Sequence, residues 1–293
     1  MKLTNRTRLL KAAFIVAIIV WPPIYRNDYA TSVMVIAGLT AMVAVGFTLL
    51  LGQAGQVSLG QATFFGTGAY TSALLTTRLD VSPLLALALG ALAAAAVAYL
   101  VGKPVLRLRG MMLVLVTLAM GEIFYIITRQ ARWVTGGLSG IGGIPWLDIN
   151  GYVIDSYIRQ YYVVWTIVLG MLFFSERAIR SRPGRAMRAL AIDEATASTL
   201  GIHVPRWKLV AFVASAIYAG IGGGLYAFVM SAINPADFGF MLSMVILIIV
   251  MIGGIGSLYG AVAGSILMTW LVRSFSGFQE YSGSLYAVVL ILL

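Results

Sequence analysis

Long apolar runs dominate this 293-residue sequence and constrain its fold more than any other feature. About ten such runs can be laid along the chain, most of them roughly 17 to 24 residues long and so able to cross the hydrocarbon core of a bilayer as a helix. They cover residues 9–25, 29–51, 61–79, 83–102, 111–130, 161–179, 209–229, 240–255, 258–275 and 281–293. We therefore expect an all-α polytopic membrane protein with one transmembrane domain over residues 1–293.

The composition excludes a water-soluble globule. Hydrophobic residues make up 60% of the chain and charged residues 10%, which is too little polar surface to cover a soluble domain. A net charge of +10 is compatible with nucleic-acid binding, but the basic residues are scattered at span ends, as membrane topology requires. The absence of cysteine excludes disulfides and thiolate sites, and the lone His203 excludes a multi-histidine centre. We expect no metal, no cofactor and no nucleic-acid partner.

The distribution of positive charge predicts the orientation. If the N-terminus is cytoplasmic, fourteen of the 20 Lys and Arg residues fall in cytoplasmic segments and six on the opposite side. This predicts cytoplasmic termini, a cytoplasmic loop at about 176–208 and an outer loop at about 131–160. The first run lacks a small-x-small cleavage site and is expected to stay as an uncleaved span. Because Leu293 lies within an apolar run, we expect the natural chain to extend further.

Residues 175–208 form the only long stretch of mixed charge. We expect a basic segment at 177–188 and then a helix that Gly201 ends as a left-handed C-cap. The shared apolar face would hold Ala189, Ile192, Ala195 and Leu200, with Asp193 and Glu194 on the polar side. Such a helix between two spans can pass the movement of a soluble partner to them. The alternative is a solvated loop that only carries topology charges.

A glycine-rich break at residues 52–60 interrupts the apolar pattern. Irregular backbone at membrane depth persists only where protein or a water-filled cavity meets it, so Gln53, Gln56, Ser58 and Gln61 are predicted to line a pathway. Ser58 and Gln61 have the spacing of a capping box, and a helix start there would favour an anionic group. At about 1.5 Å per residue from Arg78, the break falls near the cytoplasmic edge, which predicts an inner gate. A tight turn between packed helices is the alternative.

Glycines spaced by four residues indicate close helix packing. They are Gly220 and Gly224, and then Gly256, Gly260 and Gly264. This spacing lets helix backbones approach closely in lipid. The second group is not a dinucleotide loop, because Tyr259 occupies a required glycine position, and the chain has no GxxxxGK[ST] motif for ATP.

Glu122 is the only acid placed within the predicted hydrocarbon core. Intramembrane acids are costly and face a cavity or a cation, for which Arg129 and Arg273 are candidates. As a proton-coupling group, Glu122 would make the protein a secondary transporter. As a structural polar contact, it would only orient helices.

A succession of short motifs resembles one known family over almost the whole chain. The motifs are GQVSLG at 55–60, FFGTGAY at 64–70, LRLRG at 106–110, TLAMGE at 117–122, TGG at 135–137, RSRPGR at 180–185, LGI at 200–202, KLVAF at 208–212 and VMIGGIG at 250–256. In this order they resemble the LivM-type permease subunit of branched-chain amino acid ABC importers. Met111 and residues 191–193 depart from the family pattern, which affects substrate identity and partner contacts rather than the fold.

The resemblance implies an ABC importer permease fold in a bacterial inner membrane. It implies a LivH-type second permease, two cytoplasmic ATPase subunits that hydrolyse ATP, and a periplasmic substrate-binding protein, so the chain itself would not be an enzyme. ATPase coupling would fall on Arg182, Gly184, Arg185, Arg188, Asp193, Glu194 and Gly201. Urea, amides and aromatic or carboxylate compounds are alternative substrates. A proton-coupled carrier and a channel or membrane scaffold are the alternatives outside the family.

Overall fold

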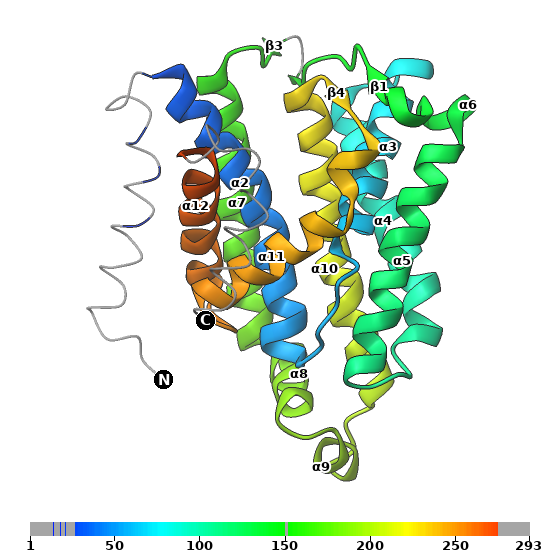
Figure 1. Ribbon diagram of the computed structural model, residues 1–293. Coiled ribbons are helices and arrows are strands. Elements are labelled where there is room, and N and C mark those ends of the chain that lie inside the picture. Colours follow the sequence, from blue (N-terminus) through cyan, green and yellow to red (C-terminus); the bar gives the residue numbers. More distant parts are fainter. Residues whose placement is uncertain (1–13, 15–17, 19–20, 22–26, 150–151, 275–293) are drawn as a thin grey trace.

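The computed structural model describes residues 14, 18, 21, 27–149 and 152–274, which form a bundle of helices (Figure 1). The predicted segment 281–293 and most of 9–25 lie outside the described residues. Short strands lie at one end of the bundle and helices α8 and α9 at the other (Figure 1). We refer to these as the strand end and the α8–α9 end.

Five described segments are long and apolar enough to cross a bilayer. They are Asp28–Gln53 (α2, Asp28–Thr48, with the π-helical turn η1, Leu49–Gln53), Pro83–Val105 (α4), Met111–Gln130 (α5), Tyr157–Arg180 (α7) and Val204–Met230 (α10). Helix α3 (Gln61–Arg78) has 18 residues, and two apolar helices, α11 (Phe240–Gly253) and α12 (Leu258–Ser274), are shorter. The chain is thus a multi-helix membrane protein, and the predicted count of about ten spans is not confirmed.

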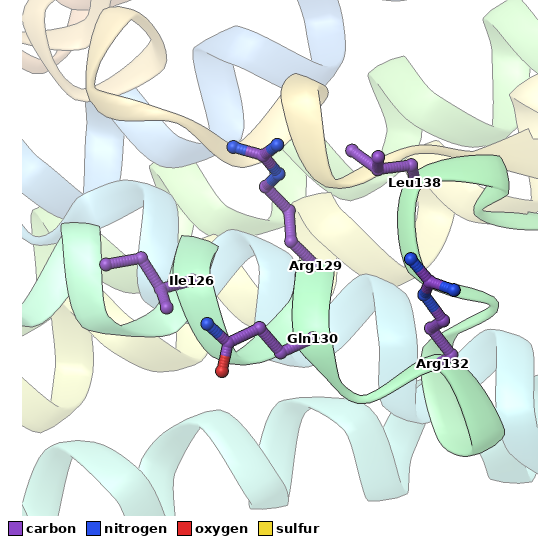
Figure 2. Close-up of a pocket in the computed structure, with 5 residues that line it drawn as sticks. All are labelled: Ile126, Arg129, Gln130, Arg132 and Leu138. Carbon is purple, nitrogen blue, oxygen red and sulfur yellow. The ribbon is translucent and has the colours of Figure 1, made fainter.

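The strand end carries a small folded layer rather than an open loop. It contains α6 (Arg132–Thr135), η2 (Gly137–Ser139), β1 (Ile141–Gly142), β2 (Asp148–Ile149), β3 (Tyr152–Val153), β4 (Ala232–Ile233) and η3 (Pro235–Phe238). Strand β1 pairs antiparallel with β4, and β2 pairs antiparallel with β3. Arg132 and Leu138 of this layer lie beside the end of α5 (Figure 2).

Helices α11 and α12 form a hairpin. Helix α11 leaves the strand end after η3, and α12 returns to that end, where the Tyr29 hydroxyl donates a hydrogen bond of 3.1 Å to the carbonyl oxygen of Arg273. The turn between them, residues 254–257, reaches the far end of the Asp28–Gln53 segment. The two predicted spans at 240–255 and 258–275 are therefore a pair of short helices that share one turn.

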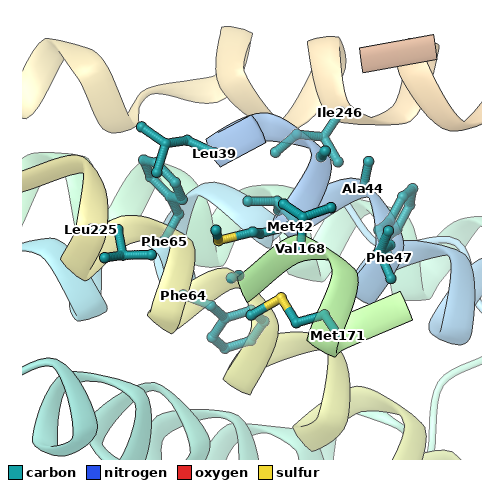
Figure 3. Packing of buried hydrophobic residues seen from close by; sticks show 14 of the residues in the cluster. Leu39, Met42, Ala44, Phe47, Phe64, Phe65, Val168, Met171, Leu225 and Ile246 are labelled. Carbon is teal, nitrogen blue, oxygen red and sulfur yellow. The ribbon is translucent and has the colours of Figure 1, made fainter. Parts of the chain in front are cut away.

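The apolar core lies around α2 and α10, and side chains from α3, α7 and α11 fill it. Phe47, Phe64, Val168 and Ile246 are fully buried there (Figure 3). The many alanines and glycines of α2, α4 and α10 let these backbones approach closely, as is usual for helices in membranes.

Two separate helices replace the single predicted helix at the α8–α9 end. Helix α8 covers Arg182–Ile192 and α9 covers Glu194–Thr199, while the basic residues 177–180 belong to the last turn of α7. The predicted face shared by one helix was wrong, because Ile192 ends α8 whereas Leu200 follows α9; both side chains are exposed, at 87% and 73%. The cause is Asp193, whose extended backbone ends α8 and whose side chain caps α9.

Candidate functional site

The candidate site is the non-helical segment 55–60 with the turns on either side of it. Gln53, Gln56, Ser58 and Gln61 are all buried there. Helix α2 first widens into the π-helical turn η1, and Gly55 adopts a positive φ of 67°, a conformation that suits glycine. The polar side chains of the break are therefore enclosed by protein, while Gly55 and Val57 are exposed.

The predicted capping box is not formed. Helix α3 starts at Gln61 with Gly60 as its N-cap, so Gln61 is the first helical residue rather than the third. Ser58 Oγ accepts a hydrogen bond of 3.3 Å from the Gly60 amide, and Gln61 Oε1 accepts one of 3.2 Å from Ser215 Oγ on α10.

Hydroxyl groups from two other helices satisfy backbone amides of the break. Thr117 Oγ1 on α5 accepts from the Leu59 amide, and Ser243 Oγ on α11 accepts from the Ala62 amide, each at 3.0 Å. Part of the anion-binding capacity of this helix start is thus already used within the chain. Sequence analysis missed Thr117, Ser215 and Ser243 as site residues, and only their polarity within apolar runs marks them.

Several buried amide atoms in the break have no hydrogen-bond partner among the described residues. They are Gln53 Oε1, both amide atoms of Gln56, and Gln61 Nε2. A buried polar group without a partner costs about 1–3 kcal/mol. These amides therefore favour a state in which water or a polar solute reaches them.

The hairpin turn between α11 and α12 packs on the start of the break. Gln53 Nε2 donates a hydrogen bond of 3.4 Å to the Gly256 carbonyl oxygen, and a Cβ on Gly52 would overlap the backbone of Gly256. Gly256 has a φ of 90° and lies in the turn, so it does not belong to the helix-packing stripe in which the sequence placed it.

Helix α8 contacts the break from the opposite side. A Cβ on Gly55 would lie 3.0 Å from the Cα of Ala191, in the last turn of α8. Gly55 has no side chain and Ala191 has only a methyl group, so the two backbones lie close together. The break is therefore in direct contact with the segment of mixed charge.

Helix α8 is fastened to the end of α7. Arg185 Nη1 donates to the Arg180 carbonyl oxygen at 3.2 Å, and Arg188 Nη2 donates to the Ile179 carbonyl oxygen at 3.1 Å. Gly184 is buried where a Cβ would overlap the Ile179 carbonyl oxygen. The two arginines thus donate hydrogen bonds to carbonyl oxygens that are free at the C-terminus of α7, where a positive charge is favourable.

Helix α9 is held by the two acids at its start. Asp193 accepts hydrogen bonds from the Thr196 hydroxyl and from the Thr196 and Ala195 amides, which lower the pKa of Asp193 below its usual value. Glu194 forms ion pairs with the buried Lys208 on α10 and, at 3.1 Å, with Arg109 in the loop before α5. Gly201, with a φ of 79°, follows α9 in the predicted left-handed conformation.

Glu122 is partly buried near the middle of α5. In the part of the chain that the structure describes, Glu122 forms no ion pair, either with Arg129 or Arg273, its predicted partners, or with another residue. Arg129 instead lies over the Tyr125 ring, 5.3 Å from its centroid.

A cavity of about 420 Å³ lies beyond Glu122 at the strand end of α5. Its lining residues are Ile126, Arg129, Gln130, Arg132 and Leu138, whose side chains gather around the α5–α6 corner (Figure 2). Two arginines in one cavity make this corner electropositive.

The remaining predicted glycines lie at close contacts. A Cβ on Gly260 or Gly264 would overlap a carbonyl oxygen of α11, and one on Gly224 would lie 2.7 Å from Ser72 Oγ. A Cβ on Gly220 would lie 2.7 Å from the Ala94 Cβ on α4. Backbone-to-backbone approach of this kind is what small residues permit in lipid.

A mostly helical membrane bundle with a buried polar break, in contact with a charged helix outside the bundle, has the construction of a transport permease. The chain belongs to the family of branched-chain amino acid transport system permease components, whose model matches residues 29–293. Its relatives are transport proteins rather than enzymes.

Three relatives illustrate the similarity. The chain is 32% identical to the high-affinity branched-chain amino acid transport system permease protein LivM of Escherichia coli K12, over 99% of this chain and 73% of the relative. It is 29% identical to LivH of the same organism, over 78% and 79% of the two chains. It is 28% identical to BraD of Pseudomonas aeruginosa PAO1, over 78% and 79%. No solved structure matches the chain.

Proposed function

We propose that this chain is one permease subunit of an ATP-driven importer that carries branched-chain amino acids across the bacterial inner membrane. A LivH-type permease would complete the pathway, two ATPase subunits would bind the α8–α9 end, and a periplasmic binding protein would deliver substrate at the strand end. The 32% identity to LivM over 99% of this chain supports the substrate class. Both termini would be cytoplasmic, and α3, α11, α12 and the segments 9–25 and 281–293 would complete the predicted set of spans.

The contact between Gly55 and Ala191 carries the mechanistic part of the proposal. An ATPase that moves α8 also moves the backbone against which the break is packed. Because Arg185 and Arg188 tie α8 to α7, the same movement reaches a long span. The α8–α9 segment is therefore suited to couple ATP hydrolysis to a gate at residues 52–60.

The gate would act by controlling access of water and substrate to the buried amides. In the described conformation all three glutamines are buried: Gln53 is bonded to Gly256 and Gln61 to Ser215, and Ala191 packs on Gly55 next to Gln56. Opening the contact with α8 would let polar groups reach these amides. The amides need only weak affinity for substrate, since tight binding would slow its release.

Transport measurements in proteoliposomes test the proposal. The chain is reconstituted with its second permease and its ATPases, and the binding protein is added with labelled leucine, urea or benzoate. We expect leucine uptake to require both the ATPase subunits and ATP on the side of the membrane where these subunits lie. Uptake that continues without ATP and stops when the proton gradient is dissipated contradicts the proposal. ATP-dependent uptake of urea or benzoate but not leucine contradicts the proposed substrate class and still supports ATP as the energy source.

A proton-coupled carrier is the second candidate, because Glu122 is an acid on a membrane helix with no ion-pair partner in the described chain. The same gradient experiment separates it from the ATP-driven importer.

A further inference from the structure

Helix α5 is the least buried of the five long helices. In its most apolar stretch, 22% of the residues are buried inside the described chain, compared with 89% for Asp28–Gln53. The buried residues are Leu113, Thr117, Gly121 and Thr128, which lie on one face at helical spacing. The helix stands at the edge of the bundle, with its opposite face turned away from the other helices (Figure 1).

The outward face of α5 carries the Glu122 carboxylate. By helical spacing, Leu115, Ala119, Glu122 and Ile126 form one stripe, in which the three apolar residues are exposed. A carboxylate that faces hydrocarbon without a partner is costly, and membrane acids therefore face protein or water. This stripe is unsuited to lipid.

The outward faces of α4 and α7 differ in this respect. At the depth of the bilayer, α4 exposes Leu85, Leu89 and Leu92, and α7 exposes Phe173 and Phe174. Their exposed basic side chains lie in the terminal turns, including Arg159 in the first turn of α7, where long side chains can reach the membrane surface. These two faces suit lipid, which leaves α5 as the long helix whose surface requires a protein neighbour.

The outward face of α5 stays polar toward the strand end. Arg129 and Gln130 lie in its last turn and share the electropositive cavity with Arg132 (Figure 2). Polar groups thus occur at two depths along this helix, with apolar residues between them. Protein interfaces in membranes combine apolar packing with such polar contacts.

We infer that the outward face of α5, centred on Leu115, Glu122 and Ile126, is the surface on which the second permease subunit docks. The inference rests on the proposed function, which supplies a paired permease. The occupant is a membrane helix with an apolar stripe and a cation or hydrogen-bond donor at the depth of Glu122, since a charge-assisted hydrogen bond compensates the buried carboxylate. Glu122 then lies at the junction of the two subunits, where a pathway shared by both would run.

Photo-crosslinking from single cysteines tests the docking face. The sequence has no cysteine, so each introduced one is unique. Leu115→Cys and Ile126→Cys probe α5, and Leu92→Cys on α4 and Phe174→Cys on α7 are controls with comparable or higher exposure, at 63% and 67%. Each variant is expressed in the complete transporter with an epitope-tagged second permease, labelled with a benzophenone maleimide and irradiated in membranes. We expect a product that contains the tagged subunit from both α5 positions and none from the controls.

Other products overturn the inference. A crosslink to the tagged subunit from α4 or α7 alone places the interface on another helix. A crosslink from α5 to a second copy of this chain shows that the occupant of this face is that copy and not the second permease. Absence of any α5 product in a complex that still takes up leucine with ATP overturns the docking face and leaves the proposed function intact. Loss of ATP dependence in the unmodified transporter instead contradicts the proposed function.

Co-purification provides a second measurement that needs no labelling. Glu122→Gln keeps hydrogen-bonding groups at the junction and should retain the tagged subunit, whereas Glu122→Leu should lose most of it. The matched substitution Ile123→Leu, beside Glu122 on the same helix, should have no effect. Full recovery of the tagged subunit with Glu122→Leu overturns the role of Glu122 at the junction.

Discussion

The carboxylate of Glu194 forms an ion pair with Lys208, a buried lysine in the first turns of α10. This ion pair joins α9 to a long span. Glu194 is therefore engaged within the chain and is not free on a polar surface. Glu194→Gln should leave the lysine buried without its counter-charge and lower stability by about 2–3 kcal/mol, somewhat below a fully buried pair. Thermal unfolding in detergent measures the loss. Arg109→Gln, which removes the exposed partner, should cost less than about 1 kcal/mol, and equal effects of the two variants contradict this account.

Arg185→Glu should uncouple the transporter. The substitution removes the bond to the Arg180 carbonyl and places negative charge at a helix C-terminus, where it is unfavourable. We expect correct membrane insertion with loss of transport-stimulated ATP hydrolysis. Arg185→Lys is the control, because it keeps the charge. Normal stimulation in Arg185→Glu shows that the tie between α7 and α8 is not needed for coupling.

Gly260→Leu and Gly224→Leu should both destabilise the subunit. The new side chains would force apart helices that meet at the backbone, at a cost above about 3 kcal/mol. Gly170→Leu on α7 is a matched control, because nothing lies within 4 Å of the position of its Cβ. Yield and melting temperature report the effect, and three indistinguishable variants show that these helices are not held in contact.

Gln56→Met should raise thermal stability and slow uptake. Methionine has a similar volume and removes two buried amide atoms that have no partner, at about 1–3 kcal/mol each. It also removes polar groups that would meet substrate. Gln61→Met is the comparison, because it breaks the bond with Ser215 and should not stabilise. A lower melting temperature for Gln56→Met indicates that water already satisfies this amide.

Glu122→Gln separates the two energy sources. In an ATP-driven permease the amide keeps much of the hydrogen bonding, so uptake should stay within about tenfold, roughly 1.4 kcal/mol. In a proton-coupled carrier the titrating group is lost and at most exchange remains. Initial uptake rates with ATP, with and without a proton gradient, distinguish these outcomes.

Features that depend on local sequence were predicted well. The five long helices follow from the length of apolar runs, and α5 begins and ends at the predicted residues. Gly201 adopts the expected left-handed conformation. It follows the end of α9 and comes shortly before α10, which has a proline in its first turn, a pattern typical of such a C-cap.

Features that depend on contacts between distant segments were not predicted. The turn between α11 and α12 packs on the end of the Asp28–Gln53 segment where residues 52 and 256 meet, and no local pattern reports that contact. The capping box failed because α3 starts at Gln61 itself, and the side chain of Gln61 instead accepts a hydrogen bond from Ser215, far along the chain. The local sequence allows Asp193 either to continue α8 or to cap a new helix. In the structure it caps α9.

The meeting of Gly52 and Gly256 has a mechanical consequence. Neither residue has a side chain, so the hairpin turn and the end of α2 touch through smooth backbone surfaces with no interlocked groups. Displacement of one surface along the other requires no rotamer change and exposes little apolar area. We therefore expect this backbone contact itself to offer little steric resistance to sliding, with the hydrogen bond from Gln53 to the Gly256 carbonyl oxygen as a directional restraint across it.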